Sequence, residues 1–281
     1  MYLLKRTSGD ALALTEEHEK IARPRKGEVH WSSFERSAYA DDVLDRAADL
    51  WKTRAVQEMY SLALFTEIAG KLHLLGAPLD WSGAFARMIA DEVRHTDLCL
   101  KTCAVLGRPA EPEIEASELH LLEERSPRAH VRQTIVAAFC IGETISGRMF
   151  KRAHAAADVP FAREVVQAIL IDETFHGELG WELGALLMRP DGPSFDEERA
   201  ALARELPRLF RHFARLCCAT GSPEWARREP EVDAGPNFGT LSLAGYARAF
   251  YDGMEEDVVP GLVAIGLPEA EGAYAELLRA S

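Results

Sequence analysis

Apolar residues recur every three or four positions along most of the chain, which is the spacing of an amphipathic helix. This pattern begins at Asp41 and runs to Gly76, a glycine that a proline follows closely and that therefore indicates a helix end. It resumes at Asp80, which we expect to cap the next helix, and it ends in the same way at Gly107. Residues 41–107 therefore predict two long antiparallel helices joined by a tight turn.

A second pair of helices follows a long connection. Residues 108–127 are rich in proline and glutamate and exceed the usual length of a connection between helices, so they indicate a crossover. Helical periodicity returns over residues 128–157 and again over 160–188, with only a short turn between them. Two helical hairpins joined by one long crossover predict an all-α chain built around a ferritin-like four-helix bundle.

The predicted bundle accounts for residues 41–189 of the 281-residue chain, and the flanking segments have other patterns. Residues 1–40 mix charged, serine and proline positions without sustained periodicity, which predicts an irregular N-terminal arm with at most one short helix. Residues 190–281 predict a helical extension that packs on the bundle, with a lid or a dimer surface as alternatives. The helical patterns of this extension cover residues 194–220, residues 242–259 and the stretch after Pro268.

The charge balance excludes two classes of partner. There are 45 Asp and Glu residues against 32 Lys and Arg, a net charge of −13, which is the wrong sign for binding a phosphate backbone or an anionic membrane. No apolar run of about 18 residues and no signal-peptide pattern is present, so we expect a cytoplasmic protein that binds neither nucleic acid nor a membrane. The five cysteines form no CxxC pair, as is typical of a reducing compartment.

A duplicated motif gives some of the carboxylates a role. Only two of the nine histidines have a glutamate three residues before them, and both also have an aspartate four residues before. They end the strings DEVRH (residues 91–95) and DETFH (residues 172–176). The repeat extends to the preceding helices, where the pattern ExxSxxxF begins at Glu58 and again at Glu143. The chain is therefore predicted to be a duplicated helical hairpin.

The spacing of the motif suits metal binding. A glutamate and a histidine three residues apart lie on one helix face, about one turn apart, so both can reach the same ion. Glu58 and Glu143 are placed to reach the same level from the neighbouring antiparallel helices. Four helices thus bring four carboxylates and two imidazoles together, which is the donor set of a dinuclear metal site. Oxygen and imidazole donors without a thiolate favour iron or manganese over a structural zinc.

The motifs resemble those of the ferritin-like di-iron carboxylate superfamily, in which a glutamate on one helix and ExxH on the next occur twice. DEVRH is similar to the DExRH string of bacterial multicomponent monooxygenases. The resemblance covers residues 41–189 and implies as metal ligands Glu58, Glu92, His95, Glu143, Glu173 and His176. It implies that Glu92 and Glu173 bridge the two ions. It also implies that Asp172 hydrogen-bonds His95, and that Asp91 hydrogen-bonds His176.

The positions one turn from the ligands predict a substrate pocket. They are apolar or small, which leaves space for an organic molecule and keeps water away from an oxidising centre. The predicted lining is Leu62, Phe65, Phe139, Cys140, Gly147 and Ile169, with Gly177 and Gly180 in the same phase.

The resemblance implies an enzyme, a non-haem di-iron oxidoreductase. It would use O₂ as co-substrate to hydroxylate, N-oxygenate or desaturate a small or carrier-bound organic substrate. Two iron ions are the expected cofactor, with manganese or a mixed pair as alternatives, and an electron donor such as a reductase or ferredoxin is the expected partner. A homodimer is one assembly that the C-terminal helices allow. The alternative functions are iron storage with ferroxidase activity, and peroxide scavenging.

Overall fold

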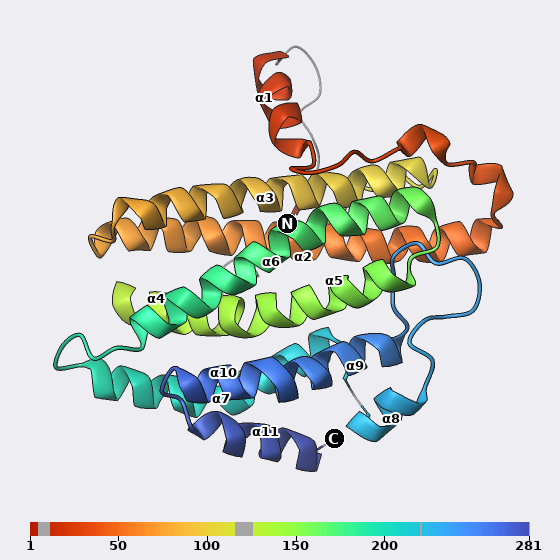
Figure 1. Cartoon of the computed structure of the whole chain (residues 1–281). Coiled ribbons are helices and arrows are strands. Elements are labelled where there is room, and N and C mark those ends of the chain that lie inside the picture. The colour runs from red at the N-terminus through yellow and green to blue at the C-terminus, as the bar shows by residue number, and fades with distance from the viewer. Residues whose placement is uncertain (5–11, 116–125, 220, 281) are drawn as a thin grey trace. The chain divides into compact units, whose positions relative to one another are not determined.

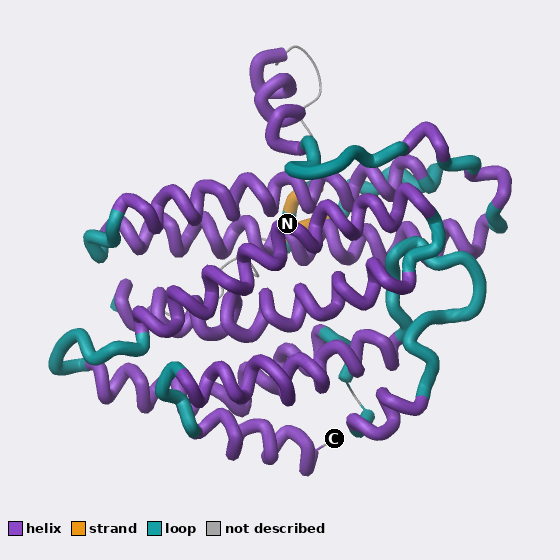
Figure 2. Tube along the Cα trace, viewed as in Figure 1, coloured by secondary structure: helices purple, strands orange, loops and turns teal. Residues whose placement is uncertain are grey.

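The computed structural model describes residues 1–4, 12–115, 126–219 and 221–280, and these residues are mostly helical (Figure 1, Figure 2). Within this described part, the strands are β1 (Tyr2–Leu3) and β2 (Glu113–Ile114), which pair antiparallel. The predicted all-α class is therefore confirmed. The chain divides into two compact units: unit 1 is residues 1–127 and 157–172, and unit 2 is residues 128–156 and 173–281.

Unit 1 is built on a long helical hairpin. Its helices are α1 (Leu12–Ala22), α2 (Asp41–Leu74), α3 (Leu79–Val105) and the first part of α6 (Pro160–Leu187). The helices α2 and α3 pack side by side and antiparallel, and α1 packs on α3 (Figure 1). Two 3₁₀ turns, Trp31–Ser33 and Arg36–Ala38, connect α1 to α2. The hairpin buries Trp51, Phe65, Ile68, Phe85 and Met88 completely.

The predicted ends of both hairpin helices are confirmed. Gly76 and Gly107 have left-handed backbone angles, with φ of 67° and 78°, as glycine adopts readily. After α2, the Ala77 N–H donates to the Leu72 carbonyl at 3.1 Å, a bond that closes the last turn. The left-handed glycines therefore end the helices by turning the chain. The backbone N–H groups at the turn can then bond to carbonyl groups that a helix end leaves unpaired.

The predicted cap of α3 is wrong by two residues and in its chemistry, because Pro78 and not Asp80 is the cap residue. The helix begins at Leu79 after Pro78, and no side chain caps its first amides. Asp80 lies inside the first turn. There its negative charge can still interact favourably with the helix dipole.

Unit 2 contains the first helical stretch of the second predicted hairpin, the last part of α6 and the C-terminal helices. Its elements are α4 (Pro127–Thr134), a π-helical segment (Ile135–Glu143), α5 (Thr144–Ala156), the rest of α6, α7 (Phe195–Leu216), α8 (Pro223–Arg228), α9 (Leu243–Gly253), a second π-helical segment (Met254–Val258), α10 (Val259–Ala264) and α11 (Glu269–Ala280). The helix α9 packs on α5 and α8, and α7 packs on α11. Phe210, Phe250 and Tyr251 are buried in this core.

The π-helical segments were not predicted. The helix expected over residues 128–157 is α4, a π-helical segment and α5 in succession, and the one expected over 242–259 extends to Ala264. The first segment, IVAAFCIGE, has one polar side chain, at its end, so its pattern cannot distinguish one helical period from another. Such segments occur often at functional sites, and this one ends at Glu143, a predicted ligand.

A short helix was also missed. The helical patterns of the sequence left out residues 221–239, which are rich in proline and glycine, but α8 lies within them. The Ser222 hydroxyl accepts a hydrogen bond from the Trp225 N–H at 3.3 Å, and Pro223 is the first helical residue. The Ser–Pro pair is a known start signal that could have found this helix.

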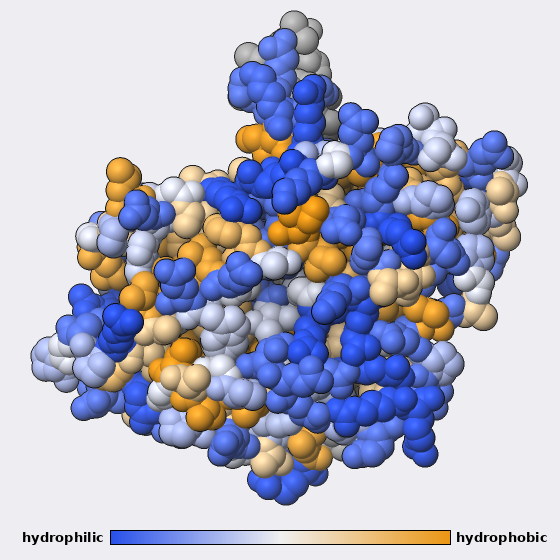
Figure 3. Space-filling model, in the orientation of Figure 1, coloured by the Kyte–Doolittle hydropathy of each residue, from blue (hydrophilic) through white to orange (hydrophobic). Residues whose placement is uncertain are grey.

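The arm predicted over residues 1–40 contains a helix, α1, as expected. The bundle over residues 41–189 and the extension over 190–281 stay predictions. The face drawn in Figure 3 is mainly hydrophilic, with small hydrophobic areas between charged side chains. Among the described helices, none has the length and apolar character needed to cross a membrane.

Candidate metal centre

Unit 1 brings together three of the predicted ligands, Glu58, Glu92 and His95, which we call the first triad. Glu58 lies on α2, and the other two lie one turn apart on α3. The Nδ1 atom of His95 is 3.4 Å from Glu58 Oε2 and 3.8 Å from Glu92 Oε1. All three side chains are buried. The hairpin thus joins a carboxylate on one helix to a Glu–His pair on the next, as predicted.

Unit 2 repeats this arrangement with Glu143, Glu173 and His176, the second triad. Glu143 ends the π-helical segment, and the other two lie on α6. The Nδ1 atom of His176 is 3.6 Å from Glu143 Oε2 and 3.8 Å from Glu173 Oε1, and all three residues are buried. The internal repeat of the sequence is therefore a repeat of local geometry.

Each triad fits one metal ion. Two donors that each lie about 2.1 Å from an ion are at most about 4.2 Å apart. The distances from the histidine Nδ1 atoms to the carboxylates, 3.4–3.8 Å, lie within that limit. The donor atoms of each triad all lie within 4.8 Å of one another, so a small side-chain movement brings any wider pair inside the limit. These buried Glu and His groups can therefore hold a metal ion.

The other ring nitrogen of His95 faces Asp172. His95 Nε2 is 3.4 Å from Asp172 Oδ2, and Asp172 is fully buried. A carboxylate in this position orients the ring and leaves Nδ1 directed at the ligand carboxylates. Asp172 therefore lies next to His95, and the hydrogen bond that the resemblance implies stays a prediction. The partnership of Asp91 with His176 stays a prediction.

Three arginines contact the buried aspartates of unit 1, and one of them, Arg87, has its Nε atom 3.6 Å from Asp91 Oδ2. The Arg94 Nη1 atom donates to Asp91 Oδ1 at 2.7 Å and to Asp172 Oδ2 at 2.8 Å. Arg25, from the segment after α1, donates from Nε to Asp91 Oδ1 at 2.7 Å. Both aspartates are fully buried, and a buried carboxylate is stable only when it is paired in this way.

The environment of Glu58 keeps its carboxyl group ionised. Burial has the largest influence on the pKa of Glu58 and raises it. The hydrogen bond and charge of His95, together with the charge of Arg54, outweigh burial, so the pKa lies below its ordinary value. An ionised carboxylate is the form that binds a cation.

The predicted pocket residues fall into two groups. Phe65, Phe139, Cys140 and Ile169 are fully buried, whereas Leu62 and Gly147 are partly exposed. Cys140 is occupied in packing, because its thiol donates to the Gly180 carbonyl at 3.4 Å. A Cβ atom added at Gly147 or Gly177 would meet no atom within 4 Å. In unit 2, open space therefore adjoins Gly147 and Gly177.

Gly180 and Gly177 should respond differently to alanine. A Cβ atom at Gly180 would lie 2.7 Å from Phe139 Cβ and 3.0 Å from the Phe139 backbone. We expect Gly180→Ala to lower the free energy of unfolding by about 1–3 kcal/mol, because the π-helical segment must shift. Gly177→Ala should be neutral or stabilise by about 0.5 kcal/mol. Urea unfolding of the metal-free variants measures both effects, and equal losses would contradict the close approach.

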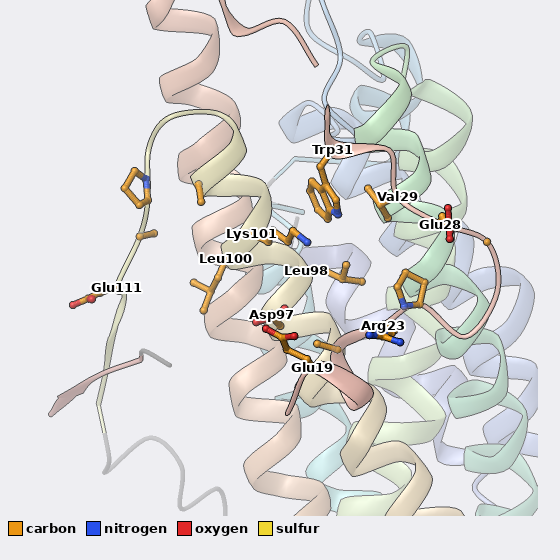
Figure 4. A pocket seen from close by; sticks show the side chains of 16 residues that line it. Glu19, Arg23, Glu28, Val29, Trp31, Asp97, Leu98, Leu100, Lys101 and Glu111 are labelled. Carbon is orange, nitrogen blue, oxygen red and sulfur yellow. The ribbon is translucent and has the colours of Figure 1, made fainter. Parts of the chain in front are cut away.

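A cleft of about 990 Å³ lies elsewhere in unit 1, between α3 and the segment from α1 to Trp31 (Figure 4). Its lining mixes apolar side chains such as Leu98 and Val29 with charged ones from both segments. The Lys101 ammonium lies 4.7 Å from the centre of the Trp31 ring. The predicted ligands and pocket residues are not part of its described lining. Because the arm has no motif, sequence reasoning did not find this cleft.

Arg25 and Arg94 were not predicted to contact the site. Arg94 belongs to the DEVRH string, so its position next to His95 was a usable signal. Arg25 lies 66 residues before Asp91 in a segment without periodicity, and no sequence signal marks it.

No protein-family model matches the chain, and neither the curated proteins nor the solved structures give a match. The resemblance to di-iron proteins therefore rests on the motifs and stays a prediction.

Proposed function

We propose that the two triads are halves of one dinuclear metal centre, and that the protein is an O₂-dependent oxidoreductase with iron as its metal. One observation carries this proposal. Each unit joins a glutamate on one helical segment to a Glu–His pair on the next, with the histidine Nδ1 facing both carboxylates. Two such triads in one chain give the donor set of a di-iron carboxylate centre.

The continuity of α6 supports a single centre. Asp172, which supports His95 of the first triad, and Glu173, which belongs to the second, are consecutive residues of this helix. One residue of a helix spans only about 1.5 Å along its axis. The four-helix bundle predicted from the sequence would place two ions at this level, with Glu92 and Glu173 between them.

The donor set supports the choice of metal. Four carboxylates and two imidazoles are oxygen and nitrogen donors suited to iron or manganese. All four glutamates are buried, and buried carboxylates of equal charge are costly without a cation. The buried cysteines do not compete as ligands. Burial raises the pKa of Cys99 well above its ordinary value and so keeps its thiol protonated.

The side chains around the triads suit an oxidation. A bound pair of iron ions supplies the activation of O₂. The buried rings of Phe65 and Phe139 would exclude water, and the open space beside Gly147 and Gly177 would admit part of a substrate. Hydroxylation consumes O₂, two electrons and two protons for each oxygen inserted, so a reductase or ferredoxin must supply electrons. The substrate class that fits is a small or carrier-bound organic molecule.

Anaerobic loading with Fe(II) followed by O₂ tests the proposal. We expect about two ions per chain, because each triad provides one ligand set. We then expect O₂ consumption and a change in the visible spectrum that does not occur in the metal-free protein. Metal analysis of the desalted protein gives the stoichiometry. Failure to retain iron, or retained iron that does not consume O₂, would contradict the proposal.

The same experiment separates the alternative functions. Uptake of iron far beyond two ions per chain, in a large cage detected by light scattering, would indicate storage. Faster reoxidation by hydrogen peroxide than by O₂ would indicate peroxide scavenging. Preferential retention of Mn(II) from a mixture of Fe(II) and Mn(II) would indicate that the cofactor is manganese or a mixed pair and not two iron ions.

A further inference from the structure

The two repeats differ at one charged position. In DEVRH the residue before the histidine is Arg94, whereas in DETFH it is Phe175. The guanidinium of Arg94 is buried and bridges Asp91 and Asp172. A duplicated site would be expected to hold two arginines against its two aspartates. The second repeat does not supply one.

Arg25 occupies that role from outside the repeat. Its Nη2 and Nε atoms lie 2.5 Å and 2.7 Å from Asp91 Oδ1, and its Nε atom lies 3.3 Å from Asp172 Oδ1. Each aspartate is thus contacted by both Arg25 and Arg94. Arg87 contacts Asp91 through Oδ2 at 3.6 Å, whereas the guanidinium groups that contact Asp172 among the described residues are those of Arg25 and Arg94.

We infer that Arg25 is a positioning residue that supplies the guanidinium missing from the second repeat and, through Asp172, holds the ring of His95. Asp172 contacts Arg94 and His95 through Oδ2 and Arg25 through Oδ1. The ion pair between Arg25 and Oδ1 favours the orientation of the carboxylate in which Oδ2 faces Arg94 and His95. Because His95 Nε2 faces that carboxylate, a fixed Asp172 directs Nδ1 at Glu58 and Glu92.

The N-terminal arm therefore contributes to the site of unit 1. Further polar contacts hold the segment around Arg25 to α3. The Arg94 Nε atom donates to the Arg23 carbonyl at 2.8 Å, and His18 Nε2 lies 3.0 Å from Asp97 Oδ1. The cleft in Figure 4 separates much of the rest of this segment from α3. The side chain of Arg25 is 36 % exposed, so it reaches the buried aspartates from the surface.

The inference rests on the proposed metal centre, and Co(II) binding tests it in the full chain. We expect Arg25→Gln to weaken Co(II) binding at one of two sites by about 10–100-fold, the usual cost of losing a group that orients a ligand. The visible absorption of that Co(II) should also shift. Arg25→Lys, which keeps the charge but not the planar fork, should recover part of both. The matched control is Lys26→Gln, because Lys26 is an exposed cation one residue away.

Repeating the substitution in an Asp172→Asn protein distinguishes a positioning role of Arg25 from general destabilisation. In the Asp172→Asn protein, Arg25→Gln should change Co(II) affinity much less than in the wild type, because the connection to His95 is already altered. An equal loss in both backgrounds, or wild-type affinity and spectrum in Arg25→Gln, would overturn the role assigned to Arg25.

A metal-independent measurement distinguishes failure of this inference from failure of the proposed function. Nuclear magnetic resonance of metal-free protein with ¹⁵N-labelled histidine reports the ring of His95, assigned with a His95→Gln variant. We expect the His95 ring signals to move in Arg25→Gln and not in Lys26→Gln. If the wild type binds no Co(II), the metal centre is refuted while a shifted His95 signal still supports Arg25. Unmoved signals refute the role of Arg25 whatever the metal result.

Discussion

Replacing Glu92 with alanine lowers the iron content of the anaerobically loaded chain from about two ions to one or fewer, which is the largest functional effect that we expect. Glu92 is 1 % exposed, belongs to the first triad and is an implied bridging ligand. Its loss would remove a donor from both ions, so the cost should exceed the roughly 10–100-fold that follows loss of an orienting group. Metal analysis after desalting measures the change, and O₂ consumption should fall with it.

The repeat provides matched comparisons for this result. Glu173→Ala removes the equivalent carboxylate of the second triad and should have a similar effect. Glu178→Ala is the control, because Glu178 is an exposed residue of the same helix, α6. Two ions retained by Glu92→Ala, or iron lost equally in Glu178→Ala, would refute the assignment of Glu92 as a ligand.

Replacing Arg94 with methionine should cause the largest loss of stability. The Arg94 side chain is 5 % exposed and bridges Asp91 and Asp172, which are both fully buried. Its removal leaves Asp172 with the 3.3 Å ion pair to Arg25, and leaves Asp91 with Arg25 and the more distant Arg87. Breaking a buried pair from one side costs about 3–5 kcal/mol, so we expect Tm to fall by about 10 °C. Calorimetry of the metal-free protein measures this effect without interference from metal binding.

A surface arginine, Arg199, provides the control variant for this prediction. Arg199 pairs with Glu269 at 3.1 Å, and both side chains are partly exposed. Arg199→Met should therefore cost no more than about 1 kcal/mol. Arg94→Lys keeps a cation but not two directed N–H groups. Its loss of stability should therefore lie between those of Arg94→Met and Arg199→Met. If Arg94→Met loses no more stability than Arg199→Met, the buried ionic group does not stabilise the fold as proposed.

The sequence was most informative where chemistry depends on local spacing. The i, i+3 relation in DEVRH and DETFH places Glu and His on one helix face, and both pairs are adjacent in the structure. Gly76 and Gly107 end their helices because a left-handed residue is needed there. These features could be predicted because a few neighbouring residues determine them.

The sequence was less informative about the type of helix, α or π, that a segment adopts. The apolar run before Glu143 has no polar face from which a period can be measured, so its π-helical form was missed. The same limit affected the predicted pocket. Phase alone placed Cys140 and Gly180 in its lining, but the thiol of the first donates to the carbonyl of the second. The π-helical segment and α6 pack closely at these two residues. The hydrophobic pattern of either segment alone does not reveal that contact.

The sequence by itself determined the helical class, the duplicated motif and the two sets of Glu and His candidate ligands, because periodicity and short spacing encode all three. Only the tertiary structure decided which groups support those ligands. Asp172 reaches His95 across 77 residues of sequence, and Arg25 reaches Asp172 from an arm without any motif. Buried charges must find partners wherever the fold provides them, and no local pattern records a partner that distant parts of the chain bring together.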